Sequence, residues 1–511
     1  MTRPWLAVLG ALAVAVAAAS CGGSGGRGDG GPSDDGARDG TGTGPNVVVI
    51  MTDDQTAESL RVMTRTQQLL VDQGTTFTNG IATFPLCCPA RAQFLTGQYS
   101  HNNGVRDNTL PDGGYPALDD DETLPVWLQE AGYATSHVGK YLNAYTRDAG
   151  PDAPPGWDRW FSLVDPTATD YFDYDINDNG RFLRRGTADD DYQTDVLADR
   201  AVDEVHRMAA GDQPFLLHFW PTAPHSGTGP GALPFSPAPA PRHLEQFADE
   251  PLLDSPAMRE TDVSDKPDYV AGVEQAFALG VVEYNLANGT DLTLDQLATE
   301  SYRRYLESLL AVDEAVGRIV EALDEEGVLD DTVIVFLSDN GWSFGEHGIP
   351  FAKVLPYENV LRVPFVVRGG GFAAGATVDE QVGIIDLPAT ILALAGVAPS
   401  LTQDGRPLPG REGDGVEPVD ALPERALLLE SPPRGSGRIP HYDGVRAPRY
   451  TYVRYETGEI ELYDRQADPD QLTNIATDPA HTDLVATLEQ LMAGLMGCVG
   501  TGCQAPAPPG T

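Results

Sequence analysis

The chain has 511 residues with 76 acidic and 33 basic side chains, so its formal net charge is −43. Thirty of the basic residues are arginine, and the only lysines are Lys140, Lys266 and Lys353. This composition excludes the basic face that sequence-independent nucleic-acid binding or polybasic docking on anionic lipid requires. The length and the ordinary apolar fraction of 41% fit one large α/β domain with an appended unit, or two to three average domains.

The first 44 residues predict export. Residues 1–20 are a signal peptide, in which Arg3 precedes an apolar run too short to span a bilayer. Cys21 resembles the lipidated cysteine of a bacterial lipoprotein, so we expect either a cell-surface lipoprotein, held at the membrane only by this lipid, or a freely secreted protein. Residues 21–44 are rich in Gly, Asp and Ser and predict a flexible tether.

Four predicted strands each end next to polar groups that can carry chemistry. Their alternation with helical segments predicts a parallel sheet covered on both faces, in which ligands bind at the carboxyl ends of the strands. The strands and the groups that follow them are 46–51 with Asp53 and Asp54, 133–138 with Lys140, 215–220 with His225, and 332–337 with Asp339 and Asn340.

The oxygen-bearing groups among these predict a cation site. Asp53, Asp54, Asp339 and Asn340 offer carboxylate and amide oxygens, which suit Ca²⁺ or Mg²⁺. No histidine-rich set for two zinc ions lies nearby. A single Asp–Asp pair is commonly a solvated turn in a chain this acidic, and two such groups at strand ends favour the metal site.

Two segments precede the fourth strand. Residues 227–297 form a Pro-rich and then acidic insertion, for which we expect a long loop with short helices near the substrate mouth. Apolar residues recur at three- and four-residue steps from Tyr302 to Leu323 and predict a helix that serves packing. Gly327 ends it.

Cys87 begins a predicted helix. Pro89 suits the first helical turn, so a group at position 87 faces the unpaired N–H groups that can hold an anion. Thiol chemistry would need a basic partner that lowers the pKa of the cysteine. A buried inert cysteine is the structural alternative.

The segment from Cys87 to Gly97 resembles the signature of the formylglycine-dependent sulfatases, of the alkaline-phosphatase-like superfamily. It has the form Cys87-x-Pro89-Ala90-Arg91 followed by Leu95-Thr96-Gly97, and the likeness extends from Pro45 to about Asp478. Within the family, the segments at 87–89, 139–143 and 156–158 are most similar to N-acetylglucosamine-6-sulfatases and bacterial arylsulfatases. Ala90 stands where Ser is usual, and Leu142 stands where many sulfatases have a histidine, a role that Asn143 would partly cover.

The resemblance implies a fold and a division of the chain. The fold is α/β, with a large mixed, mostly parallel sheet flanked by helices and a smaller C-terminal antiparallel sheet. The catalytic domain is expected at 45–415, the C-terminal subdomain at 416–496 and a tail at 497–511. Residues 449–455 and 459–463 alternate around a turn and predict a hairpin, and 482–496 predict a final helix. Cys498 and Cys503 form either a local disulfide or two free thiols.

The resemblance to the formylglycine-dependent sulfatases also implies an activity, the hydrolysis of sulfate monoesters. The substrate would be an aryl sulfate or a sulfated carbohydrate of the glycosaminoglycan type, such as 6-sulfated N-acetylglucosamine. A formylglycine-generating enzyme would oxidise Cys87 to the nucleophile, and covalent attack on sulfur would divide hydrolysis into two easier steps.

The resemblance assigns the roles residue by residue. Ca²⁺, ahead of Mg²⁺, would be held by Asp53, Asp54, Cys87, Asp339 and Asn340. Arg91 would orient the nucleophile or a metal ligand, Lys140 and Lys353 would pair with sulfate oxygens, and His225 would protonate the leaving alcohol. Asn143, His101 and His347 are candidates for substrate contact, with hydrogen-bonded loop histidines as the alternative. The scarcity of lysine supports Lys140 and Lys353 as site residues, whereas the sequence assigns no role to Lys266.

Two other functions remain open from the sequence. A phosphodiesterase or phosphonate monoester hydrolase of the same superfamily would use the same nucleophile. A non-catalytic lipoprotein that binds sulfated glycans would not need the complete set of nucleophile, metal ligands and lysines. A phosphatase with two zinc ions is disfavoured by the segment that begins at Cys87.

Overall fold

The computed structural model describes residues 44–410, 424–435 and 439–511. The predicted signal peptide, Cys21 and nearly all of the tether lie outside these residues, as does the predicted subdomain boundary near Gly415. Among the described helices, none combines the length with the apolar character that crossing a bilayer would demand.

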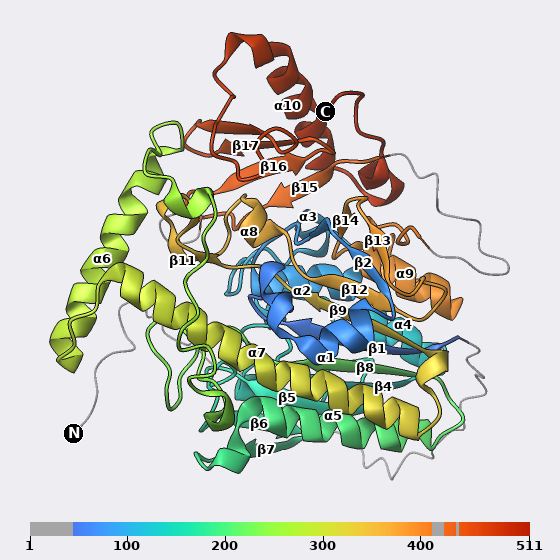
Figure 1. Ribbon diagram of the computed structural model, residues 1–511. Helices are drawn as coiled ribbons and strands as arrows, with labels where there is room; N and C mark the ends of the chain where they lie inside the picture. Colours follow the sequence, from blue (N-terminus) through green and yellow to red (C-terminus); the bar gives the residue numbers. More distant parts are fainter. Residues whose placement is uncertain (1–43, 411–423, 436–438) are drawn as a thin grey trace, which may run out of the picture. The chain divides into compact units, whose positions relative to one another are not determined.

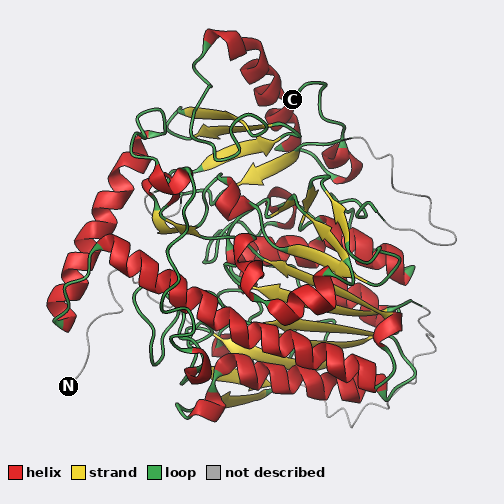
Figure 2. Ribbon diagram, in the orientation of Figure 1, coloured by secondary structure: helices red, strands yellow, loops and turns green. Residues whose placement is uncertain are grey.

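A ten-stranded mixed sheet forms the centre of the fold (Figures 1 and 2). Its five middle strands, β9, β1, β8, β4 and β5, are parallel. On one side β12 runs antiparallel to β9 and β2, and the edge strand β13 is parallel to β2; on the other side β6 and β7 run antiparallel to their neighbours. The predicted α/β class is therefore confirmed. In spatial order the strands are β13 (Ala376–Val378), β2 (Thr75–Phe77), β12 (Phe365–Arg368), β9 (Thr332–Ser338), β1 (Asn46–Thr52), β8 (Phe215–Trp220), β4 (Ala134–Gly139), β5 (Arg159–Val164), β6 (Asp175–Asp178) and β7 (Arg181–Arg184).

The register of the middle strands decides where the site forms. β1 and β9 are runs of apolar, largely β-branched residues that are buried on both faces, as parallel strands between helices must be. Thr52 pairs with Ser338, so Asp53 and Asp339 leave neighbouring strands at the same level. β8 and β4 end beside them, with Trp220 paired to Gly139.

Helices cover both faces of the sheet. α5 (Gln193–Ala209) and α7 (Leu294–Glu325) pack on one face, and α2 (Cys87–Thr96), α4 (Leu124–Glu130) and α9 (Asp386–Ala395) pack on the other (Figure 1). α7 contains the predicted helix but begins earlier, where Thr293 and Gln296 form a capping box.

The insertion is more regular than the sequence prediction allowed. Its Pro-rich first part contains only short 3₁₀ turns, but its second part folds into α6 (Asp268–Asn288), a helix of 21 residues. The expectation of short helices is therefore wrong for this part. The helix continues because residues 268–288 contain no proline, and Gly289 ends it in the left-handed conformation.

A second, antiparallel sheet contains the C-terminal segment. Its strands are β15 (Leu427–Glu430), β16 (Tyr442–Arg446), β17 (Tyr450–Tyr455) and β18 (Ile460–Asp464), and α10 (Thr482–Leu495) packs on it. The predicted hairpin is β17–β18, with Tyr450 opposite Asp464. Cys498 and Cys503 form the disulfide, and Cys503 is buried, so the tail is packed against the fold.

The described chain also contains several short helices and strands and a number of 3₁₀ turns. Among them are α1 (Thr64–Thr66), β3 (Gly80–Ile81), α3 (Ser100–Asn103), β10 (Ser343–Phe344), the 3₁₀ turn η9 (Glu346–Gly348), β11 (Pro350–Ala352), α8 (Glu358–Leu361) and β14 (Val382–Gly383).

Lys266, to which the sequence assigned no role, joins the insertion to the C-terminal sheet. Its side chain is fully buried, and Nζ donates to Glu260 Oε1 at 3.1 Å and to the carbonyl of Leu472 at 2.9 Å. The ammonium also lies 5.2 Å from the ring centre of Tyr463 in β18. Lys266 is therefore a buried structural cation.

Replacing Lys266 with methionine is expected to destabilise the protein by about 3–5 kcal/mol, because the change leaves Glu260 buried without its cation. Chemical denaturation of the full chain measures this loss. Arg259→Met is the matched control, since Arg259 is 62% exposed in its ion pair and should change stability little. A loss for Lys266→Met no larger than that of the control would contradict the structural role.

Candidate active site

The carboxyl edge of the main sheet brings four predicted site residues together. Asp53, Asp54, Cys87 and His225 each offer one ligand atom, and these atoms lie within 4.8 Å of one another. They come from the end of β1, the start of α2 and the loop after β8. The structure thus forms the cluster at the edge where the sequence predicted it.

Cys87 is the first residue of α2 and lies in the middle of this cluster. Its side chain is fully buried, and the thiol donates to Asp53 Oδ1 at 3.4 Å. Lys353 Nζ lies 2.8 Å from Cys87 Sγ. Burial raises the pKa of the Cys87 thiol to about 12, and Asp53 acts in the same direction. An unmodified thiol here is protonated at neutral pH and is a weak nucleophile.

Arg91, one helical turn after Cys87, fixes two carboxylates. Its guanidinium is buried, with Nε donating to Asp339 Oδ2 at 2.8 Å and Nη2 to Asp53 Oδ2 at 3.0 Å. Nη1 donates to the carbonyl of Lys140, and the guanidinium lies 5.4 Å from the ring centre of Trp220. Arg91 therefore binds two of the predicted metal ligands.

Asp54 is held in a conformation that few non-glycine residues adopt. Its φ is 67°, and three partners hold it there: its N–H donates to Asp339 Oδ1, its carbonyl accepts from the Tyr305 hydroxyl, and its Oδ1 accepts from Asn340 Nδ2 at 2.6 Å. Positive φ at such a residue costs free energy and is common at functional sites. The surrounding structure thus fixes where the Asp54 carboxylate points.

The oxygens at this edge fit a divalent cation. Asp54 Oδ2 and Asn340 Oδ1 are buried and have no hydrogen-bond partner within the described chain. Such orphaned oxygens are costly unless a ligand or water completes them. Burial and the Asp53 charge raise the pKa of Asp339 to about 6, so a cation here would stabilise its ionised form. Oxygen ligands of this kind suit Ca²⁺ or Mg²⁺.

Two of the three lysines face the cluster. Lys140 Nζ donates to Asp53 Oδ2, and Lys353 Nζ donates to Asp54 Oδ1 at 2.6 Å. Burial works against both charges, but Asp53 raises the pKa of Lys140, and Asp54 raises that of Lys353 well above 10.5. Both ammonium groups are therefore charged and can pair with an anion beside Cys87.

His225 forms the partly open side of the cluster. Its Nε2 lies 3.6 Å from Asp54 Oδ2, and its side chain is 18% exposed. Its Nδ1 lies 2.6 Å from the carbonyl oxygen of Ser226, which makes Nδ1 the donor and leaves Nε2 to exchange a proton with the site. Burial lowers the pKa of His225.

Three candidate substrate contacts are not part of the four-residue cluster. Asn143 is half-buried and its Oδ1 has no hydrogen-bond partner within the described chain. His347 is buried in η9 and bonds to Glu260 Oε2 through Nδ1, so it belongs to the Lys266 network. His101 in α3 bonds to Glu430 of β15 and to the carbonyl of Cys498.

His101 gives a pH prediction. Its two ring nitrogens face acceptors at 3.0 Å each, so it binds them best when doubly protonated. Burial opposes the charge, but Glu430 raises the pKa of His101 above 6.5.

A pKa that is raised in the folded state stabilises the protein at pH values below the unfolded-state pKa. This stabilisation is lost as the pH rises through the folded-state pKa. We expect the difference in melting temperature between the native protein and His101→Gln to be larger at about pH 6 than at about pH 8.5. Thermal melts at both pH values measure it, and an equal difference at both would contradict it.

Tyr305 and Trp220 are functional positions that the sequence did not identify. Tyr305 lies on α7, a helix for which the sequence predicted packing alone, yet its hydroxyl donates to the Asp54 carbonyl and accepts from the Thr56 N–H. Trp220 appeared only as the last residue of a strand, and its ring lies against Arg91. Neither position carries a local sequence signal, because both contacts depend on tertiary packing.

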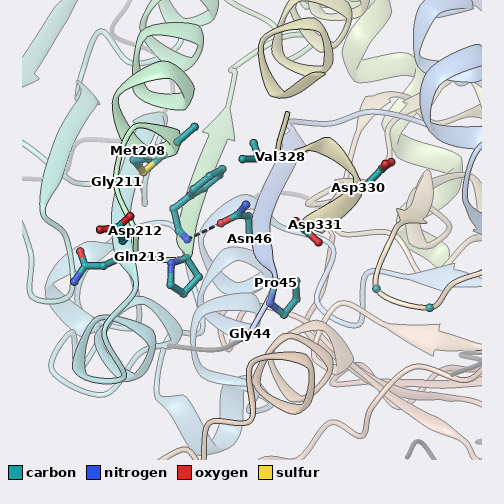
Figure 3. Close-up of a pocket in the computed structure, with 15 residues that line it drawn as sticks. Gly44, Pro45, Asn46, Met208, Gly211, Asp212, Gln213, Val328, Asp330 and Asp331 are labelled. Carbon is teal, nitrogen blue, oxygen red and sulfur yellow. Dashed lines mark hydrogen bonds between the residues drawn. The ribbon is translucent and has the colours of Figure 1, made fainter. Parts of the chain in front are cut away.

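A pocket of about 620 Å³ lies at the opposite, amino edge of the sheet (Figure 3). It is lined by the starts of β1 and β8, where Asn46 Oδ1 accepts from the Phe215 N–H. Three aspartates, Asp212, Asp330 and Asp331, line it, and its lining holds no lysine, arginine or histidine within the described chain. This pocket is unsuited to an anionic ester, so the Cys87 cluster remains the candidate active site.

Comparisons with known proteins agree with this geometry. The sulfatase family model matches residues 45–397. An arylsulfatase of Volvox carteri is 34% identical over 513 residues, covering 90% of this chain and 76% of that protein. The human N-acetylglucosamine-6-sulfatase is 30% identical over 505 residues, covering 90% of this chain and 86% of that protein. A solved structure in complex with its substrate D-glucosamine-2-N,6-O-disulfate has a TM-score of 0.73 at 26% identity, covering 88% of this chain and 97% of that one.

Proposed function

This chain belongs to the sulfatase family of sulfuric ester hydrolases, and we propose that it cleaves the 6-sulfate of an N-acetylglucosamine unit outside the cell. The nucleophile is formylglycine made from Cys87, and the bound cation is Ca²⁺. The observation that carries the proposal is the position of Cys87, between the Asp53–Asp54 carboxylates and the Lys353 ammonium. The substrate follows from the similarity to N-acetylglucosamine-6-sulfatases.

Each residue of the cluster has a defined task in this reaction. A formylglycine hydrate supplies two hydroxyl groups, one to attack sulfur and one whose deprotonation releases sulfate. The cation, held by Asp53, Asp54, position 87, Asp339 and Asn340, supplies Lewis acidity. Lys140 and Lys353 bind the sulfate oxygens, and Arg91 keeps the carboxylates of Asp53 and Asp339 in place.

Export is proposed from the N-terminal segment. The predicted signal peptide, residues 1–20, ends directly before Cys21, and the 21–44 tether would separate the catalytic domain from a lipid anchor. An exported enzyme would also meet polymeric sulfated sugars, which do not cross membranes unaided. Metabolic labelling with a fatty acid and its loss in Cys21→Ala separates the lipoprotein from free secretion.

A substrate panel tests the activity. We expect release of sulfate from N-acetylglucosamine 6-sulfate and from nitrophenyl sulfate, with slower or no turnover of a phosphodiester and a phosphonate monoester. Faster phosphoryl or phosphonyl hydrolysis would instead favour the related hydrolase activity. Glycan binding without turnover of any ester would favour the non-catalytic alternative.

His225→Ala is expected to affect the two sulfate esters differently. A general acid contributes about 10²–10⁴-fold when the leaving group needs a proton. The kcat/KM for N-acetylglucosamine 6-sulfate should fall by this amount, and that for nitrophenyl sulfate should fall far less, because nitrophenolate leaves without protonation. His206→Ala is the control, since His206 is 40% exposed and bonds to Glu326. Equal losses on both esters would contradict the acid role.

A further inference from the structure

Arginines converge on one pocket beside the C-terminal sheet. The pocket measures about 450 Å³, and its lining residues come mainly from α8 and from the turns that follow β16 and β18. Four guanidinium groups and two carboxylates are among its lining residues, which gives the lining a local excess of positive charge in a chain of net charge −43. These residues are Arg362, Arg446, Arg449, Arg465, Glu358 and Asp470.

Two of the four pocket arginines, Arg446 and Arg449, already bind carboxylates. Arg446 binds Glu358 through two hydrogen bonds of 2.8 and 2.9 Å and donates to Gln381 at 2.7 Å. Arg449 binds both oxygens of Asp464. These pairs hold the walls of the pocket and leave the other two guanidinium groups to face an occupant.

Arg465 and Arg362 lack a full set of partners. The Arg465 side chain is 9% exposed, and its Nη2 donates to the carbonyl of Ala447. Its Nε is buried without a hydrogen-bond partner in the described chain, and Glu358 Oε1 lies 3.9 Å from it. Arg362 is exposed, and within the described residues its guanidinium has no ion pair. Burial and repulsion from Arg446 lower the pKa of Arg465 to about 9. A buried guanidinium of this kind is under-compensated, and an oxyanion would complete it.

We propose that this pocket binds an oxyanion of the sulfate class, through Arg362 and Arg465. The site is separate from the Cys87 cluster and does not depend on catalysis there. Planar guanidinium groups bind tetrahedral oxyanions through paired hydrogen bonds. The oxyanion is either free inorganic sulfate or a sulfate group of a longer sulfated glycan, since both present the same oxygens.

Arg362→Ala tests the site without disturbing the packed network. Arg362 is exposed and forms no ion pair with another described residue, so this variant should fold normally. Arg181→Ala, at an exposed arginine on β7, is the matched control. Isothermal titration of the full chain with sodium sulfate, at constant ionic strength, should show two sulfate sites per chain. One of them should weaken by about tenfold or more in Arg362→Ala, while kcat for nitrophenyl sulfate stays unchanged.

Arg465→Met provides a second measurement. Loss of the sulfate site that Arg362→Ala weakens would support binding in the arginine pocket. The melting temperature of Arg465→Met, measured separately, shows whether the variant is folded. Unchanged sulfate affinity in both variants would overturn the proposal. A loss of sulfate affinity no larger than that in Arg181→Ala would overturn it too.

Kinetics with glycans identify the source of the oxyanion. A rise in KM for a multiply sulfated oligosaccharide in Arg362→Ala, with no change for the monosaccharide, assigns the pocket to a polymeric substrate. An unchanged KM for both, together with the weakened titration, assigns it to free sulfate.

Discussion

Cys87→Ala is expected to lower kcat for any sulfate ester by at least about 10⁴-fold, because loss of a covalent nucleophile removes the reaction path and leaves only binding and electrostatic effects. The thiol lies against Asp53 and Lys353 in a buried cluster, so no other described side chain can take its position. Steady-state assays with nitrophenyl sulfate measure the loss. Mass spectrometry of the tryptic peptide 66–91 from the active protein should show the lighter formylglycine in place of cysteine.

Cys88→Ala is the matched control for this experiment. Cys88, the second residue of α2, is also buried but packs in the hydrophobic core, so its replacement should change stability modestly and leave turnover near the native value. Full activity of Cys87→Ala would refute the proposed mechanism, and so would an unmodified thiol at position 87 in fully active protein.

Removal of the divalent cation is expected to reduce kcat by about 10³-fold or more, because Lewis-acid stabilisation contributes several kcal/mol to the transition state. Chelation followed by dialysis gives the metal-free protein, and added Ca²⁺ should restore turnover better than Mg²⁺. Added Ca²⁺ at a hundredfold excess over Kd should also add about 2.7 kcal/mol to the free energy of unfolding and so raise the melting temperature.

The Asp54→Asn variant tests whether Ca²⁺ stabilises the protein by binding at the Cys87 cluster. The variant keeps the shape of the side chain but loses a charge and one of the orphaned carboxylate oxygens, so its melting temperature should respond little to Ca²⁺. Asp199→Asn, at a residue 69% exposed, should respond like the native protein. Full turnover by rigorously metal-free protein would contradict the cation site.

The main sheet and most of the cluster were predictable because the relevant information is local. Continuous apolar runs at 46–51 and 332–337 predict buried parallel strands, and parallel strands place Asp53 and Asp339 at one edge. The helix that begins at Cys87 was likewise encoded by Pro89 in its first turn.

The contacts that depend on tertiary packing could not be read from the sequence. Arg91 was expected to reach Cys87 or a metal ligand, but only the packed structure shows that it binds Asp53 and Asp339 together. His101 and His347 lie near motifs in the sequence, yet both bind carboxylates on other segments. Nearness along the chain was a poor guide for these two histidines.

The low exposure of the three lysines has a practical consequence for chemical labelling. The side chains of Lys140 and Lys266 are 2% and 0% exposed, whereas that of Lys353 is 15% exposed at the mouth of the cluster. Amine-acylating reagents such as succinimidyl esters should therefore react with Lys353 before any other lysine side chain, and bound sulfate should slow that reaction. One amine reagent would then act as a selective affinity tag for the catalytic centre, whereas random immobilisation through surface lysines would fail.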